Sequence, residues 1–421
     1  EISACLVGSE MCIRDRSLLV ENFRKKALKC KDKRMSTEKK FDVGYPTGYL
    51  AFDFMNGVKV SVKNEQVDFT YNSIGIVDGS MVSCVGRSGC GKTTFVMQAS
   101  GNIIRPYENS AIFHEDIEGG ISDMRKRQLL GMTEEEFEKR YICRNTGITT
   151  ENFYERMKWI HDMKLENIDD YEYDTGLCDT AGNRIFKLQP TVVVLDSLAM
   201  LMPDELAGPM GAAAIARKNT QLIKRIIPML KMAGIIFFVI NHILPDPSLL
   251  PKKTQTAWLK QGERVSGGET AIYLANNFLR FDDRNKLSED KEFGINGILV
   301  DILFVKSRTN NAGKTVSMVF DYAHGFDPEL SLYLLLNEQG RIHGSGIGMF
   351  LQDRSDIKFS KKTFRTKLKE NAEFQQIFYE ECLDALEQLI NTTSVDVLEE
   401  KEYNLDTTSV MLKMMRERQA A

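Results

Sequence analysis

The stretch that decides the fold is a glycine-rich loop, Gly86-Arg87-Ser88-Gly89-Cys90-Gly91-Lys92-Thr93-Thr94. It follows an apolar run typical of a buried strand, residues 81–85, and it precedes a pattern typical of a helix. A strand, a loop of the form G-x-x-x-x-G-K-[ST] and a helix are together the context of a phosphate-binding loop. Backbone N–H groups in such a loop, with the N-terminus of the helix, surround phosphate groups. The sequence therefore predicts a nucleoside triphosphate site.

Individual residues of this loop have distinct expected roles. Lys92 is placed to reach the β- and γ-phosphates of ATP, and the hydroxyl group of Thr93 is placed to bind Mg²⁺. Cys90 lies among positive neighbours, so it is either a reactive thiol or a passive small residue, and we favour the second interpretation. We expect ATP and Mg²⁺ as cofactors and residues 86–94 as their contacts.

Composition limits the class of protein. The chain has 421 residues, of which 43% are hydrophobic, so it can bury a sizeable core in two or three domains. The eight cysteines include no C-x-x-C pair, which argues against a disulfide framework or a cysteine zinc site and predicts a cytoplasmic location, in a host cell if the source is viral. The sequence contains no apolar run that is long enough and free enough of charge to predict a membrane span. The net charge of −4 means that any contact with DNA must be local.

The two ends of the chain differ from its middle. Residues 1–17 resemble translated sequencing-adapter DNA, so we expect them to be a sequence artefact and exclude them from fold prediction. Residues 18–44 combine a short apolar helical face with a basic run, which indicates either a polymerisation arm or a solvated tail. We expect an ATPase core at residues 45–335. For residues 336–421 we expect a small α-rich C-terminal domain that ends in an acidic tail.

Two further apolar runs predict strands buried on both faces. Residues 191–195 are followed by Asp196, and residues 235–240 are followed by Asn241 and His242. Strands that alternate with helical stretches indicate crossover connections, and hence an α/β fold with a mostly parallel central sheet. In such sheets ligands bind at the carboxyl ends of the strands. Asp196 is therefore placed to hold Mg²⁺ beside Thr93, with a helix cap as the alternative.

The order of these motifs resembles the RecA recombinases, and most closely the UvsX-like strand-exchange recombinases of T-even-type phages. The resemblance covers residues 45–335 and implies a RecA-type core. Besides the phosphate loop, the motifs that carry it are Asp116-Ile117-Glu118, Asp196-Ser197, Asn241-His242, Ser266-Gly267-Gly268 and Lys306-Ser307-Arg308-Thr309.

The resemblance assigns catalytic roles residue by residue. Glu118 matches the carboxylate that polarises the attacking water, although a shift in register would give this role to Glu115. His242 matches the position that senses the γ-phosphate. Lys306 and Arg308 match two cations that reach the ATP of the neighbouring subunit, while a solvated strand edge is the alternative. In addition, Arg125 stands where the family commonly stacks a tyrosine on adenine.

Two long loops predict DNA contacts. The segments 203–216 and 244–266 are rich in small residues or interrupted by proline, and they carry cations and a tryptophan suited to phosphates and bases. A mobile surface loop is the alternative for each. The expected DNA-binding residues are Arg217, Lys218, Lys252, Lys253, Trp258, Lys260, Arg264, Gly267 and Gly268.

The expected function follows from this resemblance. It implies a DNA-dependent ATPase that forms a helical filament of many copies on single-stranded DNA and pairs it with homologous duplex DNA in recombination and repair. Single-strand-binding and loader proteins would be further partners, and no membrane is expected. Two other classes remain open: a hexameric replicative helicase on the same core, and a nucleotide-switched DNA-binding mediator that does not hydrolyse ATP.

Overall fold

The computed structural model describes residues 43–63, 68–178, 184–204, 212–245, 258–260, 262–266, 274–288, 293–308, 312–352 and 354–394. The chain divides into two compact units, Glu1–Phe41 and Asp42–Ala421, and all described residues belong to the second. The expected artefact, nearly all of the expected arm and the acidic tail lie outside these ranges. Within them, none of the helices has the length and apolar character needed to cross a membrane.

A ten-stranded sheet forms the centre, and its main path runs in the order β16-β15-β14-β13-β5-β11-β10-β6-β7, with β12 paired to β11. The strands from β13 to β7 along this path are parallel, whereas β14, β15, β16 and β12 pair antiparallel. The expected α/β fold with a mostly parallel central sheet is therefore confirmed. The bounds are β5 (Met81–Gly86), β6 (Ile112–Asp116), β7 (Tyr141–Arg144), β10 (Thr191–Asp196), β11 (Ile235–Pro245), β12 (Glu263–Val265), β13 (Asn277–Leu287), β14 (Gly297–Ser307), β15 (Thr315–Asp321) and β16 (Gly325–Asp327).

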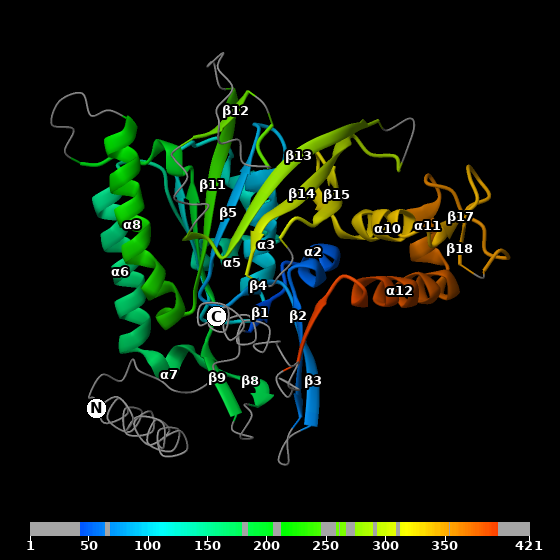
Figure 1. Ribbon diagram of the computed structural model, residues 1–421, viewed down its shortest axis with the longest axis horizontal. Helices are drawn as coiled ribbons and strands as arrows, with labels where there is room; N and C mark the ends of the chain where they lie inside the picture. Colours follow the sequence, from blue (N-terminus) through cyan, green and yellow to red (C-terminus); the bar gives the residue numbers. More distant parts are fainter. Residues whose placement is uncertain are drawn as a thin grey trace, which may run out of the picture. The chain divides into compact units, whose positions relative to one another are not determined.

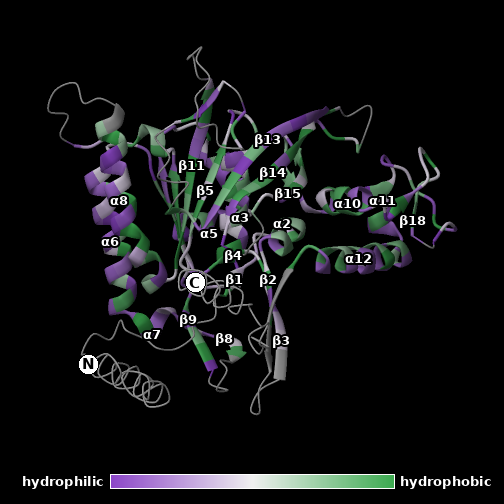
Figure 2. Cartoon of the chain, viewed as in Figure 1, coloured by the Kyte–Doolittle hydropathy of each residue, from purple (hydrophilic) through white to green (hydrophobic). Residues whose placement is uncertain are grey.

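Helices cover both faces of the parallel strands. Successive residues of β5 and β10 are buried and alternate between two hydrophobic clusters, because side chains in a strand point to opposite faces. One cluster contains residues of α3 (Lys92–Ile104) and α4 (Asp123–Leu130), and the other contains residues of α6 (Thr150–Glu166) and α8 (Ala212–Ala233). Figure 1 shows α6 and α8 side by side, and Figure 2 shows hydrophobic and hydrophilic residues alternating along α8.

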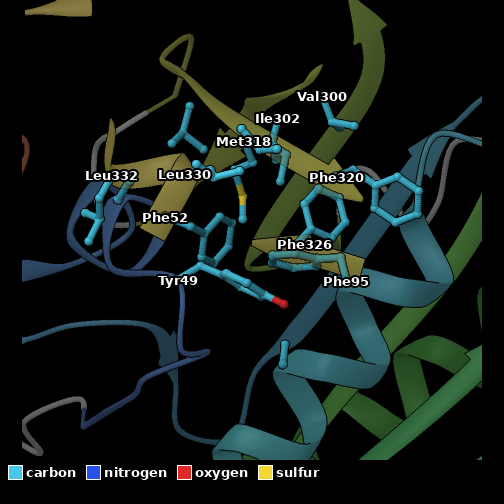
Figure 3. Packing of buried hydrophobic residues seen from close by; sticks show 14 of the residues in the cluster. Tyr49, Phe52, Phe95, Val300, Ile302, Met318, Phe320, Phe326, Leu330 and Leu332 are labelled. Atoms are coloured by element: carbon cyan, nitrogen blue, oxygen red, sulfur yellow. The ribbon is translucent and has the colours of Figure 1, made fainter. Parts of the chain in front are cut away.

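The C-terminal helices share the first of these clusters. It extends from Phe95 of α3 through Phe52 of α2 (Leu50–Met55) to Leu330 of α10 (Pro328–Glu338), as Figure 3 shows. The rings of Phe52 and Phe95 lie 5.0 Å apart, and those of Phe95 and Phe326 lie 5.8 Å apart. Two more helices, α11 (Phe364–Glu370) and α12 (Ala372–Glu387), add buried phenylalanines. Residues on both sides of the expected domain boundary at residue 335 therefore pack around one hydrophobic interior.

Smaller sheets surround this arrangement. Strands β8 (Glu172–Cys178) and β9 (Arg184–Leu188) pair antiparallel. Helix α12 ends at Glu387, and β19 (Asn391–Ser394) pairs with β2 (Val58–Lys63), which in turn pairs with β3 (Asp68–Ser73). The other elements are β1 (Gly44–Tyr45), β4 (Ile76–Val77), α5 (Glu134–Arg140), α7 (Ile168–Tyr171), a 3-10 turn (Leu198–Met200), β17 (Ile342–His343) and β18 (Phe350–Leu351).

Candidate active site

The phosphate loop leaves β5 at the carboxyl end of the parallel strands and enters α3. Gly91 has a φ of 84°, a left-handed conformation that a residue with a Cβ atom adopts only with strain. A Cβ atom on Gly86 would lie 2.5 Å from the carbonyl oxygen of Phe281 on the adjacent strand. Glycine is therefore required at both ends of the loop for it to turn this tightly against the sheet.

Lys92 lies inside the loop and is 5% exposed. Its ammonium group donates to the carbonyl oxygens of Gly86, at 3.1 Å, and Arg87, at 2.8 Å. These bonds hold the charge at the centre of the loop, where the β- and γ-phosphates would meet it. Cys90 is buried, and burial raises the pKa of its thiol, which fits the interpretation as a passive small residue better than a reactive one.

Thr93 and Asp196 lie together although they are far apart in the sequence. The hydroxyl group of Thr93 donates to Oδ2 of Asp196 at 2.7 Å. The other carboxylate oxygen of Asp196 is buried and has no hydrogen-bond partner among the described residues. Burial raises the pKa of Asp196 to about 6, and Glu118 and Asp116 add to the effect, while the bond from Thr93 opposes it. A hydroxyl group beside a buried oxygen that lacks a partner fits a Mg²⁺ site.

Glu118 lies next to the same carboxylate. It follows β6, and its Oε1 is 2.5 Å from Nε2 of His242 on β11. Ligand atoms of Glu118, Asp196 and His242 all lie within 4.8 Å of one another. The structure thus brings together three residues that the sequence analysis placed at the ends of separate strands. A carboxylate and an imidazole in contact can orient a water molecule and exchange a proton with it.

Backbone and buried charge position the turn that carries Glu118. The N–H groups of Ile117 and Glu118 donate to the carbonyl oxygen of Asp196, at 2.8 and 3.2 Å. Asp116 accepts a bond from the N–H of Gly119 at 2.9 Å and pairs with Lys126 at 2.8 Å. Both of its oxygens are thus in use. This turn is fixed to the sheet on both sides of Glu118.

Lys126 of α4 is buried, with 3% of its surface exposed. Ligand atoms of His114, Asp116 and Cys143 lie within 4.8 Å of one another, which would suit a metal ion. The ammonium group of Lys126 occupies this position, however, because it is also within 3.5 Å of the Cys143 sulfur. The negative charge of this cluster is thus neutralised by Lys126 rather than by a metal ion.

Glu115, the alternative catalytic carboxylate, lies on the opposite face of β6. Its side chain is fully buried and pairs with Arg156 of α6 at 3.0 Å. Burial raises the pKa of Glu115, while Arg156 and Arg144 oppose the shift. Geometry therefore favours Glu118 over Glu115 for a role at the nucleotide.

Asn241 and His242 connect the site to the return of the second long loop. The side-chain N–H of Asn241 donates to the carbonyl oxygen of Ser266, and the N–H of Ser266 donates to the carbonyl oxygen of His242 at 2.9 Å. The next residues, Gly267 and Gly268, lie outside the described part. A change at His242 thus has a direct backbone route to the start of the double-glycine segment.

Lys306 and Arg308 lie away from this site. They stand at the end of β14, which runs antiparallel to β13, so they lie near the amino ends of the parallel strands. The N–H of Arg308 donates to the carbonyl oxygen of Asn276 at 3.2 Å, just before β13 begins. Arg308 also lines a cavity of about 170 Å³ together with Asp78 and Lys231. Neither cation can serve the phosphate loop of its own chain.

Arg125, the candidate for the adenine site, is engaged with the turn after β15. Its guanidinium group donates to the carbonyl oxygens of Tyr322, at 3.2 Å, and Ala323. It also donates to Gln128 at 2.7 Å. These bonds attach α4 to a turn whose Tyr322 is 53% exposed. A stacking role for Arg125 stays a prediction.

The expected DNA-binding residues fall into three groups. Arg217 and Arg264 are exposed. Three others have partners within the protein: Lys218 pairs with Glu151 at 3.6 Å, Lys260 lies 3.6 Å from Asp282, and the ring of Trp258 packs edge-on against Phe278 at 5.1 Å. The remaining ones lie outside the described residues: Lys252, Lys253, Gly267 and Gly268.

Sequence analysis missed a charged group beside the loop. Arg280 of β13 is 1% exposed, and it binds Asp282 and Glu263. The available signal was an arginine inside the apolar run Phe278-Leu279-Arg280-Phe281, because a buried charge needs a partner. That signal could not name Glu263, which the fold alone brings there.

Comparisons with known proteins give distant relatives, and no family model matches the chain. It is 24% identical over 252 residues to the DNA repair protein RadA of Halalkalibacterium halodurans, a match that covers 58% of this chain and 46% of that protein. It is 26% identical over 221 residues to the energy-coupling factor transporter ATP-binding protein EcfA2 of Clostridium perfringens, covering 47% and 70%. A structure of the RadB recombinase aligns with a TM-score of 0.37 and 19% identity, over 60% of this chain and 92% of that one. The chain thus matches about half the length of RadA.

Proposed function

We propose that the chain is a DNA-dependent ATPase of the RecA recombinase type, which assembles on single-stranded DNA and pairs it with a homologous duplex. The observation that carries the proposal is the contact between Glu118 and His242 beside Thr93 and Asp196, joined through Ser266 to the second long loop. The similarity to RadA supports a role in DNA repair. The closer likeness to T-even phage recombinases rests on the motifs alone.

In this proposal each residue of the site has one task. Lys92 and the loop backbone bind the phosphates, and Thr93 and Asp196 hold Mg²⁺, which would offset the charge of the β- and γ-phosphates. Glu118 orients and deprotonates the attacking water. His242 contacts Glu118 from β11, which lies on the other side of β10, and a change in the contacts of His242 at the γ-phosphate would be passed to Ser266.

Lys306 and Arg308 complete the proposed site only in an assembly. They lie near the amino ends of the strands, opposite the phosphate loop, so they could reach an ATP molecule only on another copy. Head-to-tail contact between different surfaces generates an open helical filament unless the rotation closes a ring. Hydrolysis would then depend on assembly, because the cations that stabilise the transferring phosphate come from the neighbour.

The test measures ATP hydrolysis with and without single-stranded DNA, beside electron microscopy of the same samples. The proposal expects hydrolysis stimulated by DNA and open filaments, followed by strand exchange between homologous molecules. Closed rings that unwind a fork would instead show a helicase. DNA binding with no turnover, unchanged by Glu118→Gln, would show a nucleotide-switched mediator.

A further inference from the structure

A carboxylate between two arginines connects the phosphate loop to the second long loop. Glu263 of β12 accepts from Arg280 at 2.8 Å and 3.3 Å, and it pairs with Arg87 of the phosphate loop at 3.1 Å. Its side chain is 4% exposed. The sequence analysis gave Glu263 no role, and the proposed hydrolysis does not use it.

The pair between Glu263 and the buried Arg280 is the fixed part of this group, and we call it the anchor. Arg280 is buried on β13 beside β5, and it binds both Glu263 and Asp282 through paired nitrogens. Burial opposes the charge on Glu263, but hydrogen bonds from Arg280 outweigh it and hold the pKa of that carboxyl below its usual range. Arg280 also donates to the carbonyl oxygen of Trp258 at 2.5 Å. Arg280 therefore attaches the described return of the loop, residues 258–260 and 262–266, to the sheet through Trp258 and Glu263.

The ion pair between Glu263 and Arg87 is the part of this group that can exchange its partner. The side chain of Arg87 is 64% exposed, and in the described part its ion pair is the one with Glu263. Arg87 immediately follows Gly86 in the loop that surrounds the phosphates, so a bound triphosphate brings negative charge close to its guanidinium group. Arginine binds phosphate and carboxylate oxygens with the same planar set of donors, so the two anions compete for it.

We propose that Glu263 is a positioning residue that couples occupancy of the phosphate loop to the placement of residues 258–260 and 262–266. Phosphates draw Arg87 away from Glu263. The restraint that Arg87 places on β12 is then released, while Arg280 stays bound to Glu263. This route is separate from the one through His242, since it reaches β12 at its first residue rather than at Ser266. Its meaning for DNA rests on the proposed function, but the link itself does not require DNA.

The chain contains a natural reporter of this segment. Trp258 is one of two tryptophans, and Trp159 is 55% exposed on α6, so Trp159→Phe leaves Trp258 as the only emitter. In this background, binding of a slowly hydrolysed Mg²⁺–ATP analogue changes the emission of Trp258. Glu263→Gln abolishes most of that change. It also tightens nucleotide binding by about two- to tenfold, because the phosphates no longer compete with a carboxylate for Arg87.

Several variants separate this role from a structural one. Loss of a structural residue would lower the melting temperature and leave nucleotide binding equal or weaker. Glu263→Asp keeps the charge and retains part of the Trp258 response. Should Glu263→Gln fail to fold, Arg87→Gln breaks the same ion pair from its exposed side and must also abolish the response. The control Asp174→Asn, which breaks the exposed Arg184–Asp174 pair on the β8–β9 hairpin, leaves both readouts unchanged.

The proposal is overturned if nucleotide leaves the emission of Trp258 unchanged in the parent protein, or if both Glu263→Gln and Arg87→Gln respond as the parent does. Failure of the proposed function would be seen elsewhere, as hydrolysis that DNA does not stimulate. The Trp258 response and the tighter binding of Glu263→Gln are measured without DNA, so each idea stands or falls on its own data.

Discussion

The two ends of the parallel strands carry opposite chemistry. At the carboxyl ends lie the phosphate loop and the acids Asp116, Glu118 and Asp196. At the amino ends lie basic residues: the buried amine of Lys164 donates to carbonyl oxygens that precede β10 and β11, and the backbone N–H of Arg308 donates to the one that precedes β13. In the proposed function the carboxyl ends bind a nucleotide and its metal ion, and Arg308 at the amino ends approaches a nucleotide on another copy. This difference between the two ends is what a site shared between two copies would require.

The largest effect is expected from removing a cation at the amino ends of the strands. We expect Arg308→Ala to lower DNA-stimulated turnover by about 10³-fold or more, the range seen for arginines that act across an interface. Nucleotide affinity of the isolated protomer should hold, because Arg308 lies away from its own phosphate loop. Hydrolysis assays and nucleotide titration check the two statements.

Mixing variants shows whether Arg308 acts on another copy. The variant Glu118→Gln is changed at the carboxyl ends of the strands and keeps its amino ends intact. The variant Arg308→Ala is changed at the amino ends and keeps its carboxyl ends intact. In an equal mixture about one interface in four joins the two intact halves, so about a quarter of the parental turnover should return. A mixture as inactive as its components would place Arg308 outside the proposed shared site.

The second prediction concerns the carboxyl end. We expect Glu118→Gln to lower turnover by about 10²- to 10⁴-fold while nucleotide binding remains, because the base is lost and the phosphate contacts are kept. The matched change is Glu115→Gln, three residues earlier on the other face of β6. It weakens the buried pair with Arg156 and should lower the melting temperature rather than the turnover. The reverse pattern would assign the catalytic role to Glu115.

The third prediction uses pH to test the amino end. Burial lowers the pKa of Lys164 to about 7, so between pH 7 and 10 the unfolded chain binds a proton that the folded one does not. Stability should therefore rise with pH across this window, by at most about 1.4 kcal/mol per pH unit from this group. Denaturant unfolding at pH 7.5 and 9.5 measures the slope. Lys164→Met should flatten it, and an unchanged slope would mean that Lys164 stays charged when folded.

The smallest effect concerns DNA. Arg217 is exposed near the start of α8, whereas the neighbouring Lys218 pairs with Glu151. If Arg217 contacts a phosphate, Arg217→Ala should reduce the salt dependence of single-stranded DNA binding by about one unit of slope. Lys218→Ala should change it less. Equal effects of the two changes would mean that the ion pair with Glu151 does not withhold Lys218 from DNA.

The strands that build the nucleotide site could be predicted because each is buried on both faces. The uninterrupted apolar run before Asp196 predicted a strand buried on both faces, and β10 is such a strand, with the carboxylate of Asp196 at its end bonded to Thr93. The fold class followed from the same runs. Residues at the carboxyl ends of such strands meet in space whatever their separation in sequence.

The sequence left Glu115 open as the alternative to Glu118, since the choice depends on where one strand ends. Strand β6 extends to Asp116, which directs Glu115 towards α6. The pairing of Glu263 with Arg280 and the burial of Lys126 were also missed. These partners are chosen by tertiary contacts, and no local pattern encodes them.

The pairing of β19 with β2 affects how the chain folds as it is made. Val58 leaves the ribosome early, whereas its partner Asn391 emerges more than three hundred residues later. At about 5–20 residues per second, this delay lasts tens of seconds. Throughout that time β2 lacks its second neighbour, so the pair that it forms with β3 is a two-stranded hairpin, which is marginally stable in water. The last described strand therefore completes the sheet that one of the first begins, and a nascent chain has to protect the free edge of β2 until Asn391 and its neighbours have emerged.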